Sequence, residues 1–400
     1  MHSVARPPKH RLEEGISNHC QVIVTDRKQD FVGALESVRG FAALTVLIFH
    51  STMFLTYGKE GLMHKTLWQL KSTDELLRRS VHVFFNGHIA VSLFFVLSGF
   101  VLALSLRRDD RTTSRRTFGF VGRRFFRIYP TLAINILVTA ALIAGSAFAF
   151  PTVGYASFTW GKVVENLMLH SFLVNGATWT LLIEMLAIPL ILVGHLLTKR
   201  FGTGGLLMLT AITILVLFNP GWARRLAPGD SLYFVRAYIV DYQFMFVFGM
   251  LITALPLQNF LENKQRVGKV GLFLALVIML NARFLLGYAS RWSLLFEGAA
   301  AASLIALLAY SSRLSVHNLL EWRPIRFLGR ISYSLYLYHA TVLALIIPAS
   351  IWYMTPSGAQ EHPFPISGFV ALTATLMTIP VAWLSYYLIE QPMIQLGRRF

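Results

Sequence analysis

Long runs of apolar residues recur along the chain, and each is close to the length of about 20 residues that a helix needs to cross a bilayer. Ten such runs are present, at residues 32–55, 89–106, 126–149, 179–198, 203–219, 234–256, 268–287, 293–311, 328–352 and 368–389. The pattern predicts an all-α, polytopic membrane helix bundle with about ten transmembrane helices. The fourth and fifth are the least distinct, because only Lys199, Arg200 and a glycine-rich turn separate them.

The basic residues between these runs predict the orientation of the bundle. An even number of spans places both termini on one side of the membrane. If that side is the cytoplasm, the inner segments hold 24 Lys and Arg residues and the outer segments hold 11. Cytoplasmic loops carry such an excess of positive charge, so we expect both termini in the cytoplasm.

One domain is predicted between two polar ends. Residues 1–31 lack the apolar core of a signal peptide, so we expect a flexible cytoplasmic tail there. Residues 32–392 form the predicted transmembrane domain, and residues 393–400 a short, basic cytoplasmic tail. The sequence shows no second soluble domain and no clear internal repeat.

The composition supports a membrane protein and excludes several functions. Of 400 residues, 55% are hydrophobic and 14% are charged. The net charge of +17 would suggest nucleic acid in a soluble protein, but the charges fall mostly in loops, so we expect no nucleic-acid partner. Cys20 is the only cysteine, which excludes an intrachain disulfide and a Cys zinc site. There is no His-Glu-x-x-His or Asp-rich motif, and we expect no metal and no bound cofactor.

The first apolar run contains two residues that hydrocarbon disfavours, Arg39 and His50. Eleven helical steps of about 100° bring the two side chains onto one face, about 16 Å apart along the axis. Ionisable residues within a span usually face the bundle interior and mark substrate or proton pathways. We therefore predict a buried track with a cation at one depth and a base at another. The alternative for Arg39 is a structural ion pair with Glu36.

A dense cluster of eight arginines lies at residues 107–127, before the third span. For most of them, contact with anionic lipid headgroups is the simplest interpretation. Arg123, Arg124 and Arg127 differ because they lie where the span begins, and Arg124 and Arg127 share a helix face. Guanidinium groups held in this way suit bidentate phosphate binding. We predict that these three arginines bind a cytosolic, multiply phosphorylated ligand.

Other polar residues lie in or near the spans. Glu184 either orients the histidine of the first span or pairs with an arginine, since an intramembrane carboxylate marks a functional site by default. Ser98 has no base beside it in the sequence, so packing at a helix contact explains it better than nucleophilic chemistry. Asp241 and Glu297 are candidates for a cavity wall, and His339 is a weaker second base.

Six stretches carry motifs in a characteristic order: LESVRGFAALTVLIFH, VSLFFVLSGFVLAL, RRFFRIYP, WTLLIEML, LGRISYSLYLYHATVL and YLIEQPMIQLGRR. Together they resemble the integral-membrane acyltransferase family 3, which contains bacterial O-acyltransferases of lipopolysaccharide, exopolysaccharide, Nod factor and macrolide substrates. The motif positions fall on Arg39, His50, Ser98, Arg124, Arg127, Trp179 and Glu184. Two residues depart from the family pattern: Glu36 stands where Asp is usual, and Thr180 where Ser is usual.

The resemblance implies transfer of an acyl group, most simply acetyl, from cytosolic acyl-CoA to a hydroxyl of a cell-envelope or secreted glycan or glycoside. The protein would lie among the lipids of the bacterial inner membrane, with acyl-CoA as donor substrate. His50 would be the general base, or carry the acyl group itself, because imidazole suits proton transfer near neutral pH. Arg39, about three turns closer to the cytoplasm, would be a further catalytic-site residue and, with the three arginines at the third span, hold CoA. Neither the acceptor nor the oligomeric state follows from the sequence.

A transporter or flippase for a lipid-linked sugar or a small hydrophobic solute is the alternative. Such a protein would explain ten spans and buried charges equally well. It would not explain the arginines at the third span or the ordered motifs, and repeated halves with interrupted helices are not evident in the sequence. Binding of acyl-CoA to the purified protein distinguishes the two functions.

Overall fold

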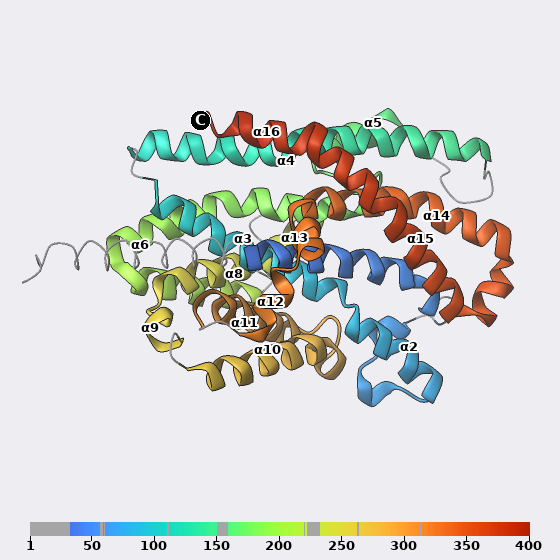
Figure 1. Ribbon diagram of the computed structural model, residues 1–400, viewed down its shortest axis with the longest axis horizontal. Helices are drawn as coiled ribbons and strands as arrows, with labels where there is room; N and C mark the ends of the chain where they lie inside the picture. The colour runs from blue at the N-terminus through green and yellow to red at the C-terminus, as the bar shows by residue number, and fades with distance from the viewer. Residues whose placement is uncertain are drawn as a thin grey trace, which may run out of the picture.

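The computed structural model describes residues 33–56, 59, 61–109, 112–149, 159–219, 221, 233–261, 264–311 and 314–400. Within these ranges the chain forms helices joined by short segments and contains no β-strand, so the predicted all-α fold is confirmed. Most of the long helices run along the longest axis of the molecule (Figure 1). The tail predicted at residues 1–31 lies outside the described residues.

The helices follow one another with few long connections. The first covers Gly33–Thr56 and ends in the 3-10 turn η1 (Thr52–Thr56). It is followed by α2 (Thr73–Phe84), α3 (Gly87–Arg107), α4 (Thr113–Ala149), α5 (Trp160–Leu167), α6 (Trp179–Phe218), α8 (Tyr233–Ala254), α9 (Leu257–Leu261), α10 (Gln265–Leu286), α11 (Arg291–Tyr310), α12 (Ser315–Leu320), α13 (Arg323–Arg330), α14 (Ser332–Glu361), α15 (Pro363–Ser385) and α16 (Gln391–Gly397). The shorter turns are η2 (Leu62–His64), η3 (Leu67–Gln69), η4 (Gly176–Thr178) and the π-helical η6 (Tyr386–Glu390).

Eight helical segments in the described part of the chain are long and apolar enough to cross a membrane. They contain the first helix, α3, α4, α6, α10, α11, α14 and α15, and α8 adds a shorter apolar helix at Val240–Ala254. Every apolar run of the sequence therefore falls on an apolar helix, with two of the ten runs in α6. The bundle has the character of a multi-pass membrane protein, while the number of crossings stays a prediction.

Helix α6 doubles back at Gly202. This residue has φ 60° and ψ −144°, a non-helical conformation that glycine adopts readily. Gly205 lies against Leu197, such that a Cβ on Gly205 would come within 2.6 Å of the Leu197 carbonyl oxygen. Residues eight apart in a straight helix would be separated by about 12 Å. The two halves of α6 are thus antiparallel neighbours, which is why one helix contains two apolar runs.

Glycines bring the backbones of α3 and α8 into direct contact at the centre of the bundle. A Cβ on Gly99 would lie 2.1 Å from the Phe246 carbonyl oxygen, and a Cβ on Gly249 would lie 2.0 Å from the Val96 carbonyl oxygen. Small residues permit such close helix approach in membranes. This contact fixes the position of α3, which forms one wall of the site described below.

The first helix crosses α13 by a similar contact. A Cβ on Gly40 would lie 2.5 Å from the Gly329 nitrogen, and a Cβ on Gly329 would lie 2.4 Å from the Glu36 carbonyl oxygen. On another side of the bundle α16 runs beside α4, where the rings of Phe126 and Phe400 stack 5.3 Å apart (Figure 1). The first helix is thereby held between α3 and the α13–α14 segment.

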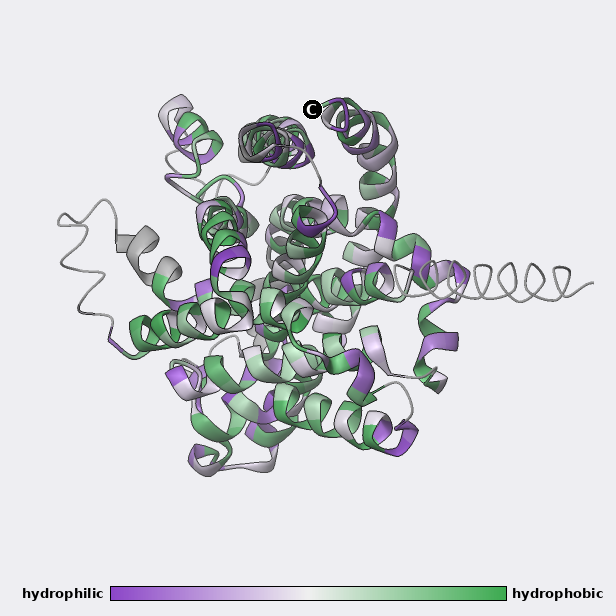
Figure 2. Ribbon diagram, turned by 90° about the vertical axis from the view of Figure 1, so that its left-hand side faces the viewer, coloured by the Kyte–Doolittle hydropathy of each residue, from purple (hydrophilic) through white to green (hydrophobic). Residues whose placement is uncertain are grey.

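Apolar side chains cover much of the outer surface of the bundle. Phe273 on α10 and Leu376 on α15 are 66% and 64% exposed. Viewed from one end of the bundle, hydrophobic residues dominate the helices, while hydrophilic residues are grouped in short stretches (Figure 2). Lipid tails provide the environment that such a surface requires.

Candidate active site

Two adjoining cavities lie along the first helix. The arginine cavity has a volume of about 90 Å³, and the histidine cavity has a volume of about 620 Å³. The polar and aromatic residues that line the arginine cavity include Arg39, Ser98, Arg124, Arg127, Glu184 and Tyr333, and those that line the histidine cavity include His50, His88, Trp179, Tyr288 and His339. Val91 and Tyr336 line both cavities, so the two are neighbours along the first helix, and we refer to the pair as the track.

The first helix supplies one polar residue to each cavity. Arg39 lines the arginine cavity, and His50 lines the histidine cavity with an exposed side chain. Helical geometry separates them by about 16 Å along the axis. The structure thus places the two residues at different depths of one track, as the eleven-residue spacing predicts. Glu36 is not within ion-pair distance of Arg39, so the alternative of a structural Arg39–Glu36 pair is not observed.

Arg124 and Glu184 form a buried ion pair in the arginine cavity. Arg124 Nη2 donates to Glu184 Oε1 at 2.6 Å, and the Ser98 hydroxyl donates to the same oxygen at 2.7 Å. Glu184 does not line the histidine cavity. Of the two roles that the sequence left open for Glu184, the structure therefore contains the pairing with an arginine. Ser98 is a hydrogen-bond donor in this pair.

The three arginines Arg123, Arg124 and Arg127 lie within α4, more than two turns after its start, and do not point the same way. Arg127 lines the arginine cavity together with Arg124, whereas Arg123 forms an ion pair with Asp109 at 3.2 Å and is not part of the cavity wall. Successive residues on a helix differ by about 100° in direction, while residues three apart share a face. The cluster predicted from sequence thus divides into two cavity residues, joined there by Arg39, and one residue outside.

The arginine cavity carries an excess of positive charge. Its charged wall residues are three guanidinium groups and one carboxylate. The carboxylate of Glu184 forms an ion pair with Arg124. Neither Arg39 nor Arg127 forms an ion pair with any residue that the structure describes. Both side chains are only partly buried. An anionic group entering this cavity would meet two guanidinium groups that are not held in ion pairs.

Two histidines are stacked in the wall of the histidine cavity. The ring centroids of His50 and His339 are 5.3 Å apart, with an angle of 29° between the ring planes. His339 Nδ1 donates to the Tyr336 carbonyl oxygen, which leaves Nε2 as an acceptor. His339 is the weaker of the two base candidates in the sequence, and the structure brings it together with His50 from a position about 290 residues away in the chain.

His88 and Tyr288 also line the histidine cavity and are not indicated by the sequence. The Tyr288 hydroxyl and His88 Nε2 share a hydrogen bond, and the ring centroids lie 4.8 Å apart. Phe49 contacts both His50 and His88 edge-on, at 5.3 and 5.7 Å. An aromatic cluster therefore surrounds the imidazoles. His88 stands at the start of a span, where the only available signal was a histidine flanked by apolar residues.

Two candidate carboxylates lie elsewhere. Asp241 forms an ion pair with Arg291 at 3.1 Å, and Glu297 forms one with Arg283 at 2.8 Å. Neither lines the arginine cavity or the histidine cavity. Ion pairing with Arg291 and Arg283 explains why these two carboxylates can stand within the apolar spans.

A buried amide network supports the wall of the histidine cavity and is likewise not indicated by the sequence. Asn175 Nδ2 donates to Asn135 Oδ1 at 2.7 Å and to the Leu337 carbonyl at 3.0 Å. Asn135 Nδ2 in turn donates to Thr341 Oγ1 at 3.0 Å. These bonds join α4, the η4 turn and α14 next to His339. Buried polar groups that satisfy one another in this way rigidify their surroundings.

Fold and site define a multi-pass helical membrane protein with an internal track that is cationic at one end and carries paired imidazoles at the other. The chain matches the family described as "Acyltransferase domain" over residues 32–387. It therefore belongs to this acyltransferase family, in agreement with the resemblance of its motifs.

Individual relatives are more distant. The chain is 31% identical to acyltransferase MdmB of Streptomyces mycarofaciens, over 38% of this chain and 36% of that protein. It is 26% identical to peptidoglycan O-acetyltransferase OatA of Listeria monocytogenes, over 78% of this chain and 52% of that protein, and 25% identical to YrhL of Bacillus subtilis, over 92% and 56%. The chain thus spans roughly a third to three-fifths of the length of these curated relatives. No solved structure matches it significantly.

Proposed function

We propose that this protein is a membrane O-acyltransferase that moves an acyl group, most simply acetyl, from cytosolic acyl-CoA to a hydroxyl of a cell-envelope or secreted glycan. The observation that carries the proposal is the pair of adjoining cavities along one helix, with arginines in one and stacked histidines in the other. Family membership supports the same reaction type.

The arginine cavity suits the anionic donor. Arg39 and Arg127 have no carboxylate partner among the described residues, and guanidinium groups bind phosphate through paired hydrogen bonds. At about 90 Å³ the cavity is smaller than the 300 Å³ or more of a typical ligand pocket. The nucleotide of CoA would therefore stay at the entrance, while a narrower part of the donor enters. Arg124, held by Glu184, would shape the wall.

The histidine cavity suits the acceptor and the base. In the proposed reaction His50 takes the proton of an acceptor hydroxyl, whose oxygen attacks the thioester carbonyl carbon. The carbon–sulfur bond breaks, and the CoA thiolate leaves and recovers a proton from the imidazolium. His339 is stacked on His50 and would hold its ring in place. A base in hydrogen-bond reach of the attacking hydroxyl contributes about 10²- to 10⁴-fold to the rate.

The acceptor is proposed to be a glycan on the outer side of a bacterial inner membrane. The name of OatA supports a cell-wall glycan, and the histidine cavity of about 620 Å³ is large enough for a sugar. Trp179 in its wall offers an aromatic face for a sugar ring.

The test is CoA release from acetyl-CoA by the purified protein in proteoliposomes, with a panel of envelope glycans, including peptidoglycan fragments, added outside. His50→Ala is compared with His170→Ala, because His170 is an exposed histidine of an outer segment that lines neither cavity. We expect glycan-dependent release by the wild type and His170→Ala, and a loss of about 100-fold or more in His50→Ala.

Two outcomes would contradict the proposal. Equal release by His50→Ala and the wild type would remove His50 as the base. Folded protein that neither binds acetyl-CoA nor releases CoA with any glycan would reject the transferase itself and favour the transporter.

A further inference from the structure

A third, small cavity lies beside the histidine cavity. The two share Phe49, His88 and Tyr288 as wall residues. The small cavity also receives Arg79 from α2 and Arg283 from α10, and we refer to it as the Arg79 cavity. Its volume of about 10 Å³ holds about one water-sized group.

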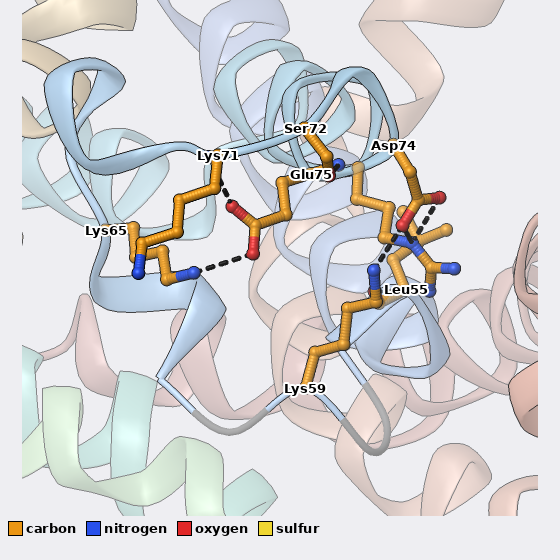
Figure 3. A network of polar contacts seen from close by, with 8 residues as sticks. Leu55, Lys59, Lys65, Lys71, Ser72, Asp74 and Glu75 are labelled. Atoms are coloured by element: carbon orange, nitrogen blue, oxygen red, sulfur yellow. Dashed lines mark hydrogen bonds and ion pairs between the residues drawn. The ribbon is translucent and has the colours of Figure 1, made fainter.

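Helix α2 is anchored firmly beside this cavity. Arg78 Nε donates to both carboxylate oxygens of Asp74 at 2.9 and 3.0 Å, and Arg78 Nη1 donates to the Leu55 carbonyl at 3.0 Å. Lys59 also pairs with Asp74, and Lys65 pairs with Glu75 at 2.6 Å (Figure 3). Arg78 therefore has a carboxylate partner, which it shares with Lys59.

The next residue, Arg79, is buried but has no carboxylate partner among the described residues. It is 4% exposed and forms no ion pair with any described residue. Its Nη1 lies 3.7 Å from the Met63 sulfur, its guanidinium carbon lies 5.5 Å from the centre of the Phe284 ring, and its Nε has no hydrogen-bond partner. None of these contacts supplies a negative charge. A buried charge without a counter-charge is strongly unfavourable, so this position favours an anionic ligand.

Arg283 adds a second unused donor to the same wall. Its Nε donates to Glu297 at 2.8 Å and its Nη1 to the Tyr288 carbonyl at 2.8 Å, while the buried Nη2 has no partner. Arg79 and Arg283 together thus carry two positive charges against the single carboxylate of Glu297. Each of these two cavity-lining arginines thus has one buried nitrogen without a hydrogen-bond partner.

We infer that the Arg79 cavity binds an anionic oxygen of the acceptor, from a carboxylate or a phosphate group, while the reacting hydroxyl of the same acceptor lies in the histidine cavity. The inference rests on the proposed function. Its geometric basis is the hydrogen-bonded pair of His88 and Tyr288, which lines both cavities and makes them neighbours. The protein is accordingly selective for acidic glycosides.

Three matched sugars test this selectivity by binding alone: methyl glucoside, methyl glucuronide with a carboxylate at C6, and methyl glucoside 6-phosphate. Calorimetry and thermal shift are measured on the purified full chain, for wild type, Arg79→Met and Lys71→Met. Lys71 is an exposed cation just before α2 and lines no cavity described above, so its removal changes charge alone. The carboxylate and phosphate arms identify which anion the cavity accepts.

We expect wild type and Lys71→Met to bind at least one acidic sugar about 10-fold or more tightly than methyl glucoside. Arg79→Met should lose this preference. Without any anion, Arg79→Met should unfold at the same or a higher temperature than wild type, because an unmatched buried charge is removed. If Arg79 had only a structural role, Arg79→Met would instead unfold at a lower temperature than wild type.

Absence of any preference in wild type, or the same preference in Arg79→Met, would overturn the inference. So would stabilisation by chloride through Arg79 without a preference among the sugars, because the cavity would then hold a simple ion. If Arg79→Met fails to fold, Arg79→Gln takes its place. Since the readout needs no turnover, failure to transfer acetyl would count against the proposed function and leave this result intact.

Discussion

Arg124 and Arg127 lie three residues apart in the same cavity wall. Truncation of Arg124 is expected to lower stability, and truncation of Arg127 is expected to lower the affinity for acetyl-CoA. Arg124→Ala removes the guanidinium bound to Glu184 at 2.6 Å, in a pair whose side chains are 8% and 19% exposed. Breaking a buried ion pair from one side costs about 3–5 kcal/mol of unfolding free energy. Because Ser98 still donates to the carboxylate, we expect the lower value, about 3 kcal/mol.

Arg127→Ala should change affinity rather than stability. Arg127 has no ion-pair partner among the described residues, so the unfolding free energy should change by less than about 1 kcal/mol. A hydrogen bond to a charged group contributes about 1.5–3 kcal/mol, which corresponds to about a 10- to 150-fold weaker affinity for acetyl-CoA.

The two effects are separated by measuring acetyl-CoA binding calorimetrically and unfolding by denaturant in the same bilayer discs. Arg123→Ala is the matched control, since Arg123 pairs with Asp109 outside the cavity and should leave the affinity unchanged. Unchanged affinity in Arg127→Ala would refute the assignment of the donor to this cavity. Equal losses of affinity in Arg123→Ala and Arg127→Ala would show that only overall charge matters.

Three further substitutions test the framework of the site. Gly99→Ala should lower the unfolding free energy by about 2 kcal/mol or more, because the new Cβ would overlap the Phe246 carbonyl. Gly145→Ala is the control, since the space around Gly145 is open and the added methyl group should not destabilise the protein. Denaturant unfolding compares the two variants. Asn175→Ala strands two buried acceptors and should cost about 1–3 kcal/mol in the same assay. Thr180→Val removes the buried hydroxyl that contacts the Tyr336 hydroxyl at 3.0 Å and the Ala177 carbonyl at 3.1 Å. It should slow acetyl transfer about 5-fold, with acetyl-CoA affinity measured by calorimetry unchanged.

The helices could be predicted because their cause is local. A run of about 20 apolar residues has few alternatives to a membrane helix, and each run does lie on an apolar helix. The turn at 199–202 was also visible, since Gly202 permits a backbone conformation that other residues avoid. The shared track of Arg39 and His50 followed from the helical period alone.

Contacts between distant segments could not be predicted in this way. The His88–Tyr288 hydrogen bond joins residues 200 positions apart, and the Asn175–Asn135 bond joins residues 40 apart. Each depends on how helices dock, which no local pattern encodes. For Arg123 the helical step of about 100° already turns the side chain away from Arg124, but no local pattern identifies Asp109 as its partner.

The junction of the two cavities shows why Thr180 can stand where the resembled family has serine. Tyr336 lines both cavities, so its ring lies where the two adjoin. The Tyr336 hydroxyl accepts a hydrogen bond from Thr180 Oγ1 at 3.0 Å and donates to the Ala177 carbonyl at 3.2 Å. Either serine or threonine supplies this hydroxyl, and the extra methyl group leaves the bond intact. What the position requires is an oxygen that holds Tyr336 against the η4 turn, at the junction of the two cavities.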